Sequence, residues 1–214
     1  MSDAVILAVD TCFGACSAAV LQGARLLGHR NEAMERGHAE ALASMVDAVM
    51  REAGIAFAAL DKLAVTTGPG TFTGQRVGLA FMRGLRLGLK KPLVGVTSLA
   101  AMAERARHEL GTTIAAAVHD ARRGEVYLEV VGRPVPASLM AFGDAAALLR
   151  EFADLALTGT GAACMGEAIG VTRIMDWIAP DAIWVARLAM ESRPSDVPRP
   201  LYLRAPDAKL PVAR

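Results

Sequence analysis

The pattern of hydrophobic and polar positions along this chain predicts a mixed α/β fold. Short apolar stretches occupy residues 4–9, 15–21 and 25–30, and such stretches are typical of strands. Helical spacing follows at 38–52, then a strand at 63–66, a helix at about 73–89, a strand at 93–96 and a helix to about residue 109. Three consecutive strands followed by alternating helices and strands predict a mixed sheet covered by helices.

The second half of the chain predicts a smaller unit. Strands are expected at 113–118, 126–131 and 155–157, a polar turn at 120–125, a turn-rich break at 132–136 and a helix around 144–152. A helix is expected at 180–191, followed by an extended, proline-rich tail. We therefore divide the chain into a first lobe at 1–98, a smaller lobe at 99–179, and a C-terminal helix and tail at 180–214 that packs back on the first lobe.

The helix predicted at 38–52 has more apolar surface than one core requires. Its apolar residues spread over roughly 220°, where about 100° is enough to face one core. The polar residues gather on one narrow side: Glu40, Ser44, Asp47 and Arg51. The helix at 73–89 is similar, with a polar side of Gln75, Arg76, Arg83 and Arg86. Its glycine pairs at i, i+4 spacing, 74/78 and 84/88, would let another backbone approach closely.

This excess of apolar surface has two interpretations. Both helices are sandwiched inside this chain, or they also form a helical bundle with a partner chain, because a soluble monomer rarely exposes so large an apolar patch. We favour the second interpretation. The predicted interface residues are His38, Ala41, Met45, Ala48, Val77, Phe81, Met82 and Leu85.

A loop rich in glycine and threonine joins the strand at 63–66 to the helix at 73–89. Helix N-termini present free amides and a positive dipole, so such a loop can cradle a phosphate. The loop has neither the Walker A lysine nor the dinucleotide-binding glycine spacing, and a plain tight turn remains an equal alternative. The candidate nucleotide-site residues are Asp10, Thr11, Gly68, Gly70, Thr71, Gly159 and Gly161.

Composition narrows the class of protein. The 214 residues carry a net charge of +1, which is unlike a dedicated nucleic-acid binder, although Arg83, Arg86, Lys90 and Lys91 form a modest basic cluster. No apolar run approaches the ~20 residues of a membrane helix, and no secretory signal is evident. The three cysteines are too few for a disulfide framework, so we expect a cytoplasmic protein.

Catalytic chemistry is largely missing from the sequence. No nucleophile–base pair can be assembled, Cys12 and Cys16 lack a second pair of metal ligands, and His108-Glu109 is not followed by the histidine of a zinc-protease motif. We therefore expect no catalytic residue, no metal and no cofactor, with weak ATP or ADP binding left open.

Several segments together resemble the TsaB (YeaZ) family. They are residues 6–11 (ILAVDT), 16–20 (CSAAV), 38–42 (HAEAL), 67–78 (TGPGTFTGQRVG), 92–99 (PLVGVTSL), 120–127 (DARRGEVY) and 200–204 (PLYLR). The resemblance implies the actin-like ATPase (ASKHA, ribonuclease H-like) fold, with two lobes of mixed sheets flanked by helices and the second lobe reduced. It also implies a subunit of the bacterial machinery that attaches a threonylcarbamoyl group to adenosine in tRNA.

The same resemblance implies the partners. TsaB-like chains join a catalytic paralogue, TsaD, through the helices that here begin near His38 and Thr73, and a small ATPase, TsaE, docks on the pair. Contact with tRNA would be indirect, through the complex, and the chain alone could form a homodimer. TsaD carries a His-x-x-x-His metal pair where this chain has Ser98 and Met102, neither of which can replace a metal-binding imidazole.

These observations favour a non-catalytic subunit that holds its partner in an active geometry. One alternative is an ATPase or acyltransferase that uses Asp10 and the glycine turns. A glycoprotease-type metallopeptidase is a weaker alternative, because its ligands are missing.

Overall fold

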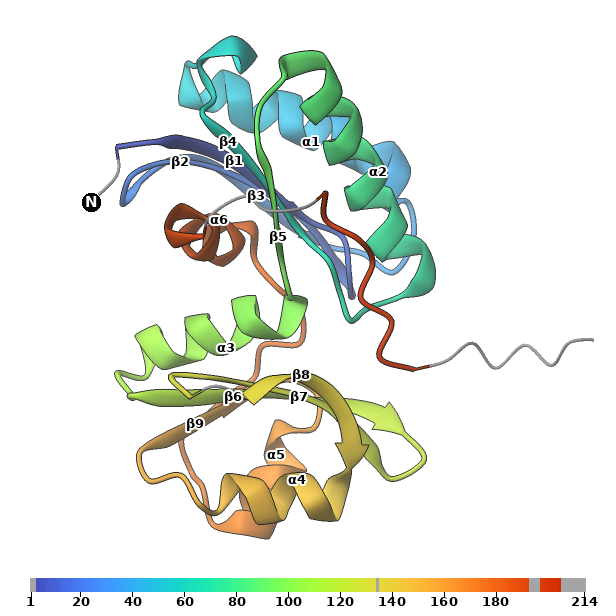
Figure 1. Ribbon diagram of the computed structural model, residues 1–214, viewed down its shortest axis with the longest axis vertical. Helices are drawn as coiled ribbons and strands as arrows, with labels where there is room; N and C mark the ends of the chain where they lie inside the picture. Colours follow the sequence, from blue (N-terminus) through green and yellow to red (C-terminus); the bar gives the residue numbers. More distant parts are fainter. Residues whose placement is uncertain (1–2, 134, 193–196, 205–214) are drawn as a thin grey trace, which may run out of the picture.

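Two five-stranded sheets form the framework of the protein (Figure 1). The computed structural model describes residues 3–133, 135–192 and 197–204. The first sheet has the order β3-β2-β1-β4-β5. Its strands are β1 (Val5–Asp10), β2 (Ala15–Gln22), β3 (Arg25–Ala33), β4 (Lys62–Thr66) and β5 (Leu93–Val96). β1 and β2 pair antiparallel, as do β2 and β3, whereas β4 and β5 join β1 in parallel.

The second sheet repeats this arrangement. Its order is β10-β9-β6-β7-β8, so each sheet places its first strand between its second and fourth. The strands are β6 (Ile114–Arg122), β7 (Glu125–Val131), β8 (Val135–Ala141), β9 (Leu155–Thr158) and β10 (Ile174–Met175). β6, β7 and β8 form the antiparallel meander, and β9 and β10 are parallel to β6. This duplicated topology confirms the predicted actin-like fold.

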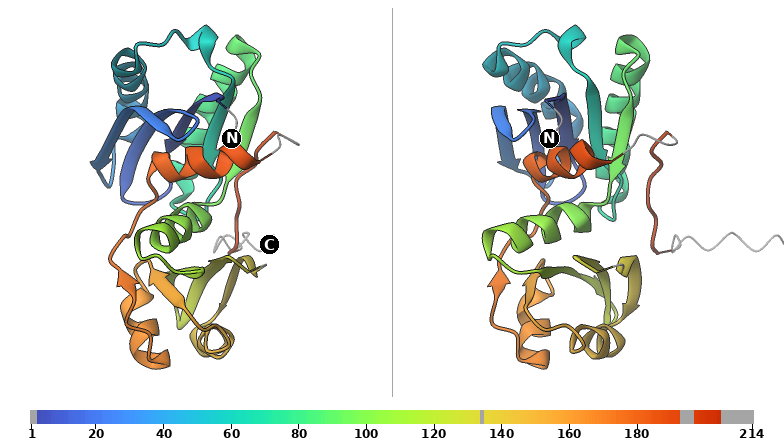
Figure 2. Two further views of the ribbon diagram at one scale, coloured as in Figure 1. Left: turned by 90° about the vertical axis from the view of Figure 1, so that its left-hand side faces the viewer. Right: turned by 60° about the vertical axis from the view of Figure 1, so that its left-hand side comes forward.

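The helices form three layers around the two sheets (Figures 1 and 2). α1 (His38–Ala53) and α2 (Phe72–Leu89) cover the outer face of the first sheet, and α4 (Phe142–Leu149) and α5 (Ala162–Ile169) cover the outer face of the second. α3 (Ser98–Glu109) and α6 (Ala182–Glu191) lie between the sheets. α6 packs on β1 and β2, and α3 packs on β6 and β7. A single-turn 3-10 helix, η1 (Phe57–Ala59), precedes β4.

Local sequence explains where the helices begin and end. Gly54 ends α1 in the left-handed region with φ 66°, which glycine adopts without strain. The hydroxyl of Thr71 accepts a hydrogen bond from Gly74 N at the start of α2, and the hydroxyl of Thr97 accepts one from Ala100 N at the start of α3. Strands and helices in the first hundred residues fall within two residues of their predicted bounds except for β3, which ends at Ala33 instead of residue 30, and η1, which was not predicted.

The second lobe differs from prediction at several elements. β6 continues to Arg122, into the expected turn at 120–125, and α4 spans Phe142–Leu149 instead of 144–152. The stretch 132–136, expected to be a turn-rich break, contains the start of β8, and α5 and β10 were not predicted. β8 is an edge strand that carries Pro136, a residue tolerated at sheet edges because it donates no ladder hydrogen bond. α5 has few large apolar residues and an internal Gly166 packed against Val171 and Ile174, so its helical periodicity is weak.

The lobes are not equal in size. Both sheets have five strands, but the outer helices contain 16 and 18 residues in the first lobe and 8 and 8 in the second. The predicted reduction of the second lobe therefore affects its helices rather than its sheet.

The segment 197–204 runs from the first lobe to the second along one edge of the molecule (Figures 1 and 2). Leu201 N donates a hydrogen bond to Thr67 O, and Arg83 of α2 donates to Pro198 O. At the other end, Arg204 donates to Ala121 O and forms an ion pair with Glu125 on the β6–β7 hairpin. The tail thus contacts both lobes, whereas it was expected to pack on the first; residues 205–214 lie outside the described part.

Candidate functional site

The glycine loop between β4 and α2 packs tightly against the end of β1. Thr71 N donates a hydrogen bond of 2.6 Å to Cys12 O. A Cβ added to Gly70 would lie 2.3 Å from Cys12 O, and one added to Gly74 would lie 2.0 Å from Thr11 O. The glycines are therefore needed because this chain's own backbone occupies the space beside them.

Asp10 and Thr11 lie beneath this loop; the hydroxyl of Thr11 and Oδ1 of Asp10 have partners within the chain, whereas the buried Oδ2 of Asp10 has none among the described residues. Asp10 is fully buried and accepts hydrogen bonds from Thr66 Oγ1 at 2.5 Å and Cys12 N at 3.1 Å. Burial raises the pKa of Asp10 from 3.8 to about 7, against the lowering effect of these hydrogen bonds. Thr11 Oγ1 donates to Gly74 O and accepts from Gly78 N, so it anchors the first turns of α2 to β1.

A second glycine turn, residues 159–161, follows β9. It packs against β6 as the first loop packs against the end of β1. A Cβ on Gly159 would lie 2.4 Å from Val118 O, and Gly161 N donates to the same carbonyl. The hydroxyl of Thr160 between them accepts a hydrogen bond from Asp120 N. Gly159 has φ +103°, so it also requires glycine for its backbone conformation.

A hollow of about 510 Å³ lies between the lobes. Of the predicted nucleotide-site residues, Gly70 and Thr71 line it, whereas Asp10 and Thr11 are buried behind the loop. Phe13, from the loop after β1, and His119, from β6, stack across the lobes with ring centroids 4.1 Å apart and line the same hollow. Burial lowers the pKa of His119 to about 4, so the ring is neutral at pH 7.

Ser98 and Met102, which replace the metal-binding histidines of the resembled paralogue, lie in the interior. Ser98 is fully buried and its hydroxyl donates to Pro69 O of the glycine loop, while Met102 is 1% exposed in the cluster between the lobes. Among the described residues, no group of three His, Cys, Asp or Glu side chains could hold a metal ion.

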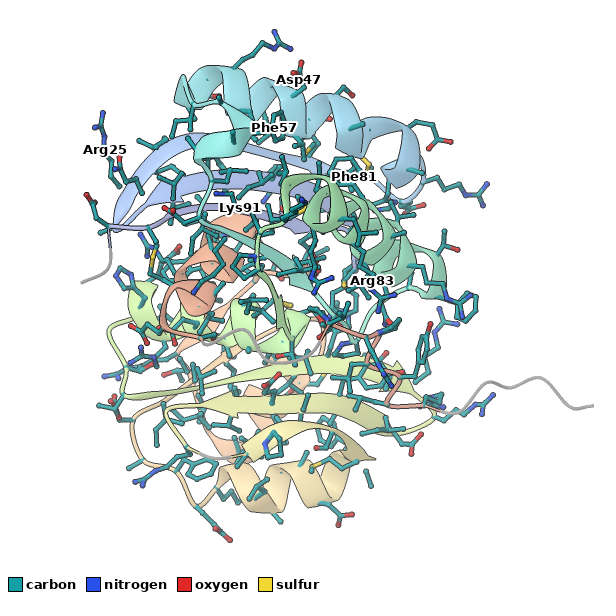
Figure 3. All side chains as sticks on the ribbon, turned by 45° about the horizontal axis from the view of Figure 1, so that its top comes forward. Arg25, Asp47, Phe57, Phe81, Arg83 and Lys91 are labelled. Atoms are coloured by element: carbon teal, nitrogen blue, oxygen red, sulfur yellow. The ribbon has the colours of Figure 1, made fainter. Side chains whose placement is uncertain are left out.

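The predicted interface residues on α1 and α2 fall into two groups. His38, Met45 and Met82 are buried within the chain, and Met45 and Met82 belong to its own core. The others are half-buried: Ala41, Ala48, Val77, Phe81 and Leu85. The four polar residues expected on the outer side of α1 are all exposed, and Figure 3 shows Asp47 on the side of α1 away from the sheet.

The structure also separates the two glycine pairs of α2. Gly74 and Gly78 pack against Thr11 of this chain. They therefore leave no room for the backbone of a partner helix. Gly84 and Gly88 are exposed, and a Cβ added to either would meet nothing within 4 Å. Leu87 beside them is 72% exposed. The C-terminal half of α2 therefore has an exposed apolar surface in which two of the residues have no side chain.

The burial of Gln75 differs from the expectation drawn from the sequence. It was placed on the polar side of α2, but it is 3% exposed and donates a hydrogen bond to Gly70 O. Its side chain would also contact a Cβ added to Gly68, at 2.7 Å. Gln75 therefore fills the glycine loop from within. No sequence signal separated it from the exposed Arg76 beside it.

Comparisons with known proteins find similarity to both TsaD and TsaB. A family model described as TsaD, tRNA N6-adenosine threonylcarbamoyltransferase, matches residues 28–133. The tRNA threonylcarbamoyladenosine biosynthesis protein TsaB of Escherichia coli (strain K12) is 38% identical over 57% of this chain and 52% of its own length. The protein of the same name from Haemophilus influenzae is 37% identical over 62% of this chain and 56% of its own length. The matches thus span about half the length of these curated relatives.

A solved structure covers nearly the whole chain. It is a crystal structure from Pseudomonas aeruginosa, described as an uncharacterized protein with similarity to peptidase YEAZ. The superposition has a TM-score of 0.78 at 31% identity and covers 94% of this chain and 100% of the other. In the described residues, no helix is long and apolar enough to cross a membrane. The sequence, the repeated lobe topology and these matches together place the chain in the TsaB (YeaZ) family of tRNA threonylcarbamoyladenosine biosynthesis proteins.

Proposed function

We propose that this chain is a non-catalytic subunit of the machinery that makes threonylcarbamoyladenosine in tRNA. It binds a TsaD-like catalytic paralogue through the outer face of α1 and α2 and holds that partner in an active geometry. A TsaE-like small ATPase then docks on the pair.

The observation that carries this proposal is the surface that folding leaves on these two helices. Val77, Phe81 and Leu85 pack against the core of the first lobe but remain half-exposed. Beside them, Gly84 and Gly88 have open space where a Cβ would be, so a partner helix can approach the backbone of α2 closely. Half-exposed apolar side chains beside small residues suit a helix–helix interface better than a solvent-facing surface.

The interior of the glycine loop supports a structural role for the predicted nucleotide site. The hydroxyl of Thr11 and one oxygen of Asp10 are hydrogen-bonded within the chain, and the spaces beside Gly70 and Gly74 hold the backbone of residues 11–12. A phosphate would have to displace these contacts. We therefore propose that the loop launches α2 rather than serving a cofactor.

Co-purification tests the proposal directly. The full chain is co-expressed with the TsaD-like paralogue, and tRNA modification is measured with and without this chain. Because Ala41 and Ala48 are half-buried on α1, the double variant Ala41→Arg/Ala48→Arg should lose at least about tenfold in affinity for the paralogue, as expected for charges placed in an apolar interface. The same variant should lower tRNA modification in proportion to the lost complex.

A matched control carries the same charges on the second lobe. Ala147 of α4 and Ala163 of α5 are exposed, so Ala147→Arg/Ala163→Arg should leave the complex unchanged. Equal affinity of both double variants for the paralogue would reject α1 and α2 as the interface. ATP hydrolysis by the isolated chain that disappears in Asp10→Ala would instead favour the ATPase alternative. Light scattering of the isolated chain shows whether the same surface forms a homodimer.

A further inference from the structure

Two exposed aromatic rings and an arginine form an ordered group at the start of α2. Phe72 is 58% exposed and Tyr202 is 47% exposed, and their rings stack with centroids 6.1 Å apart and planes at 27°. The guanidinium of Arg76 lies 3.4 Å from the centroid of Phe72, and Arg76 Nε donates a 2.9 Å hydrogen bond to Tyr202 Oη. Both rings are thus held in place while much of their surface faces solvent.

This aromatic group is continuous with the hollow between the lobes. A smaller hollow of about 160 Å³ is lined by Phe72 and Tyr202, and it shares Gly70, Tyr127 and Arg204 with the larger one. The larger hollow is also lined by Arg122 and Arg123 of the β6–β7 turn, both of which are exposed. We call the set Phe72, Arg76, Arg122, Arg123, Tyr202 and Arg204 the arginine–aromatic surface.

The β6–β7 turn contains two adjacent arginines. Arg122 and Arg123 have φ of 64° and 58°, and Gly124 follows with φ 74°. Arg123 and Gly124 form the two-residue loop of the β6–β7 hairpin, where positive φ at both positions is the geometry of a tight turn, and Arg122 lies at the adjacent irregularity of the ladder. The chain as a whole has a net charge of only +1, so the four arginines of this surface are a local concentration of positive charge. Among the described residues, the carboxylate of Asp120 accepts a hydrogen bond from Arg122 N, and Glu125 is paired with Arg204.

We propose that the arginine–aromatic surface binds single-stranded RNA. Unpaired bases stack on Phe72 and Tyr202, and backbone phosphates follow the arginines toward the hollow between the lobes. Exposed, pre-ordered aromatic rings beside a basic groove suit this ligand, because every base has a face that can stack and every nucleotide carries a phosphate. Arginine and aromatic side chains are also common in protein interfaces, so binding to the paralogue is measured below as a separate outcome. The inference rests on the proposed function, since the RNA concerned is then the tRNA whose adenosine is modified, and it replaces the indirect tRNA contact that the family resemblance implies with a direct one.

The surface differs from the basic cluster seen in the sequence. Arg83, the first residue of that cluster, donates to Pro198 O and so holds the tail rather than facing a ligand. Figure 3 shows Arg83 on the side of α2 that faces the segment 197–204. Tyr202 and Arg204 belong to the segment 197–204. The RNA-binding surface therefore forms only when this segment packs beside α2 and the β6–β7 hairpin.

Fluorescence anisotropy tests the proposal on the full chain, alone and in complex with its paralogue. The probes are a labelled RNA hairpin with an unpaired loop and a fully paired RNA duplex. The double variant Arg122→Gln/Arg123→Gln should weaken hairpin binding about tenfold and reduce the slope of log affinity against log salt by about 1.4, the value for two fewer phosphate contacts. The matched control is Arg25→Gln/Arg133→Gln, and it should change neither. Both arginines are exposed at the far ends of the sheets, Arg25 as the first residue of β3 and Arg133 in the β7–β8 turn.

Aromatic variants separate stacking from charge. Phe72→Ala should weaken binding of the hairpin about tenfold and leave the duplex unaffected, because only unpaired bases can stack on the ring. Tyr202→Phe keeps the ring and should bind like the original chain, whereas Tyr202→Ala should not. Circular dichroism of each variant confirms that it is folded.

The outcomes decide between this inference and its competitors. Equal hairpin affinity for the two double-arginine variants overturns it, as does the failure of either the chain or the complex to bind the hairpin. If the variants weaken binding to the paralogue and leave RNA affinity unchanged, the surface is a protein contact and the inference is wrong. Failure of the chain to bind the paralogue, with RNA binding that responds as described, would reject the proposed function while this inference stands.

Discussion

The two lobes share one topology but differ at the ends of their central strands. In the first lobe Val9 pairs with Val65, so Asp10 adjoins Thr66, whose hydroxyl donates to its carboxylate. In the second lobe Ala117 pairs with Thr158 at the corresponding end of β6 and β9, where no carboxylate stands beside the threonine. The hollow between the lobes is lined by Asp120 of β6, whereas Asp10 is buried behind the glycine loop and does not line it. The two lobes thus share a topology but place different side chains at the ends of their central strands.

The outer helices differ in the same sense. α4 and α5 are single short helices that complete the core of the second lobe, with Ala145, Ala146 and Leu149 facing inward. α1 and α2 are twice as long; their partly buried apolar residues pack at the margin of the first-lobe core, and α2 also exposes Gly84, Leu87 and Gly88. α4 and α5 also carry partly buried apolar residues, Phe142, Leu148 and Ile169, so the difference between the lobes is the length of the outer helices and the exposed Gly84, Leu87 and Gly88 of α2.

The largest expected effect concerns the buried carboxylate of the first lobe. Because burial raises the pKa of Asp10 from 3.8 to about 7, the folded protein holds a proton that the unfolded chain has released over that range. The stabilisation is complete below pH 3.8 and is lost as the pH rises through 7. Relative to Asp10→Asn, the original chain should lose about 4 kcal/mol of unfolding free energy between pH 4 and pH 8. Urea denaturation at a series of pH values measures this difference, and a flat difference would contradict the raised pKa.

The buried imidazole of the second lobe should have the opposite pH dependence. The pKa of His119 is lowered from 6.5 to about 4. Between these two pH values the unfolded chain therefore binds a proton at His119 and the folded chain does not. Stability is complete above pH 6.5 and is lost as the pH falls through 4. Relative to His119→Phe, which keeps the stack on Phe13, the original chain should lose about 3 kcal/mol over that window. The same denaturation series gives the answer, and loss of stability toward high pH instead would refute it.

The glycine turns of the two lobes should respond alike to an added methyl group. Gly74→Ala and Gly159→Ala each place a Cβ within 2.4 Å of a backbone carbonyl oxygen, that of Thr11 and that of Val118. Each should destabilise the fold by about 2 kcal/mol or more, because backbone atoms cannot move aside easily. Thermal unfolding measures the loss. An unchanged melting temperature for either variant would mean that its turn is looser than described.

The smallest effect should distinguish the two glycine pairs of α2. Gly84→Ala adds a Cβ in open space on a helix, so it should stabilise the isolated chain by up to about 1 kcal/mol. The larger Gly84→Leu should keep the fold and weaken binding to the paralogue, because it holds a partner helix away from the backbone. Retention of full affinity by Gly84→Leu would exclude close approach at this point.

Prediction from sequence succeeded where the signals are local. Strands of the first lobe have compact apolar stretches, and α1, α2 and α3 have caps and periodicity that are contained within a few turns. It failed for β8 and α5, whose own residues carry weak signals and whose structure depends on packing against β7 and β6. Gln75 and Arg76 illustrate the same limit within one helix, since both are polar neighbours and only one is buried.

The amino-acid sequence by itself determined the α/β class, the order of elements in the first lobe, the glycine loop and the wide apolar faces of α1 and α2. Each of these depends on spacing between near neighbours, which secondary structure converts directly into a face or a turn. Tertiary structure alone decided that the loop is filled by residues 11–12, that Met45 and Met82 belong to the core, and that Tyr202 and Arg204 join Phe72 and Arg122 on one surface. Those outcomes depend on contacts between residues far apart in the chain, and a pattern of neighbouring residues cannot predict such contacts.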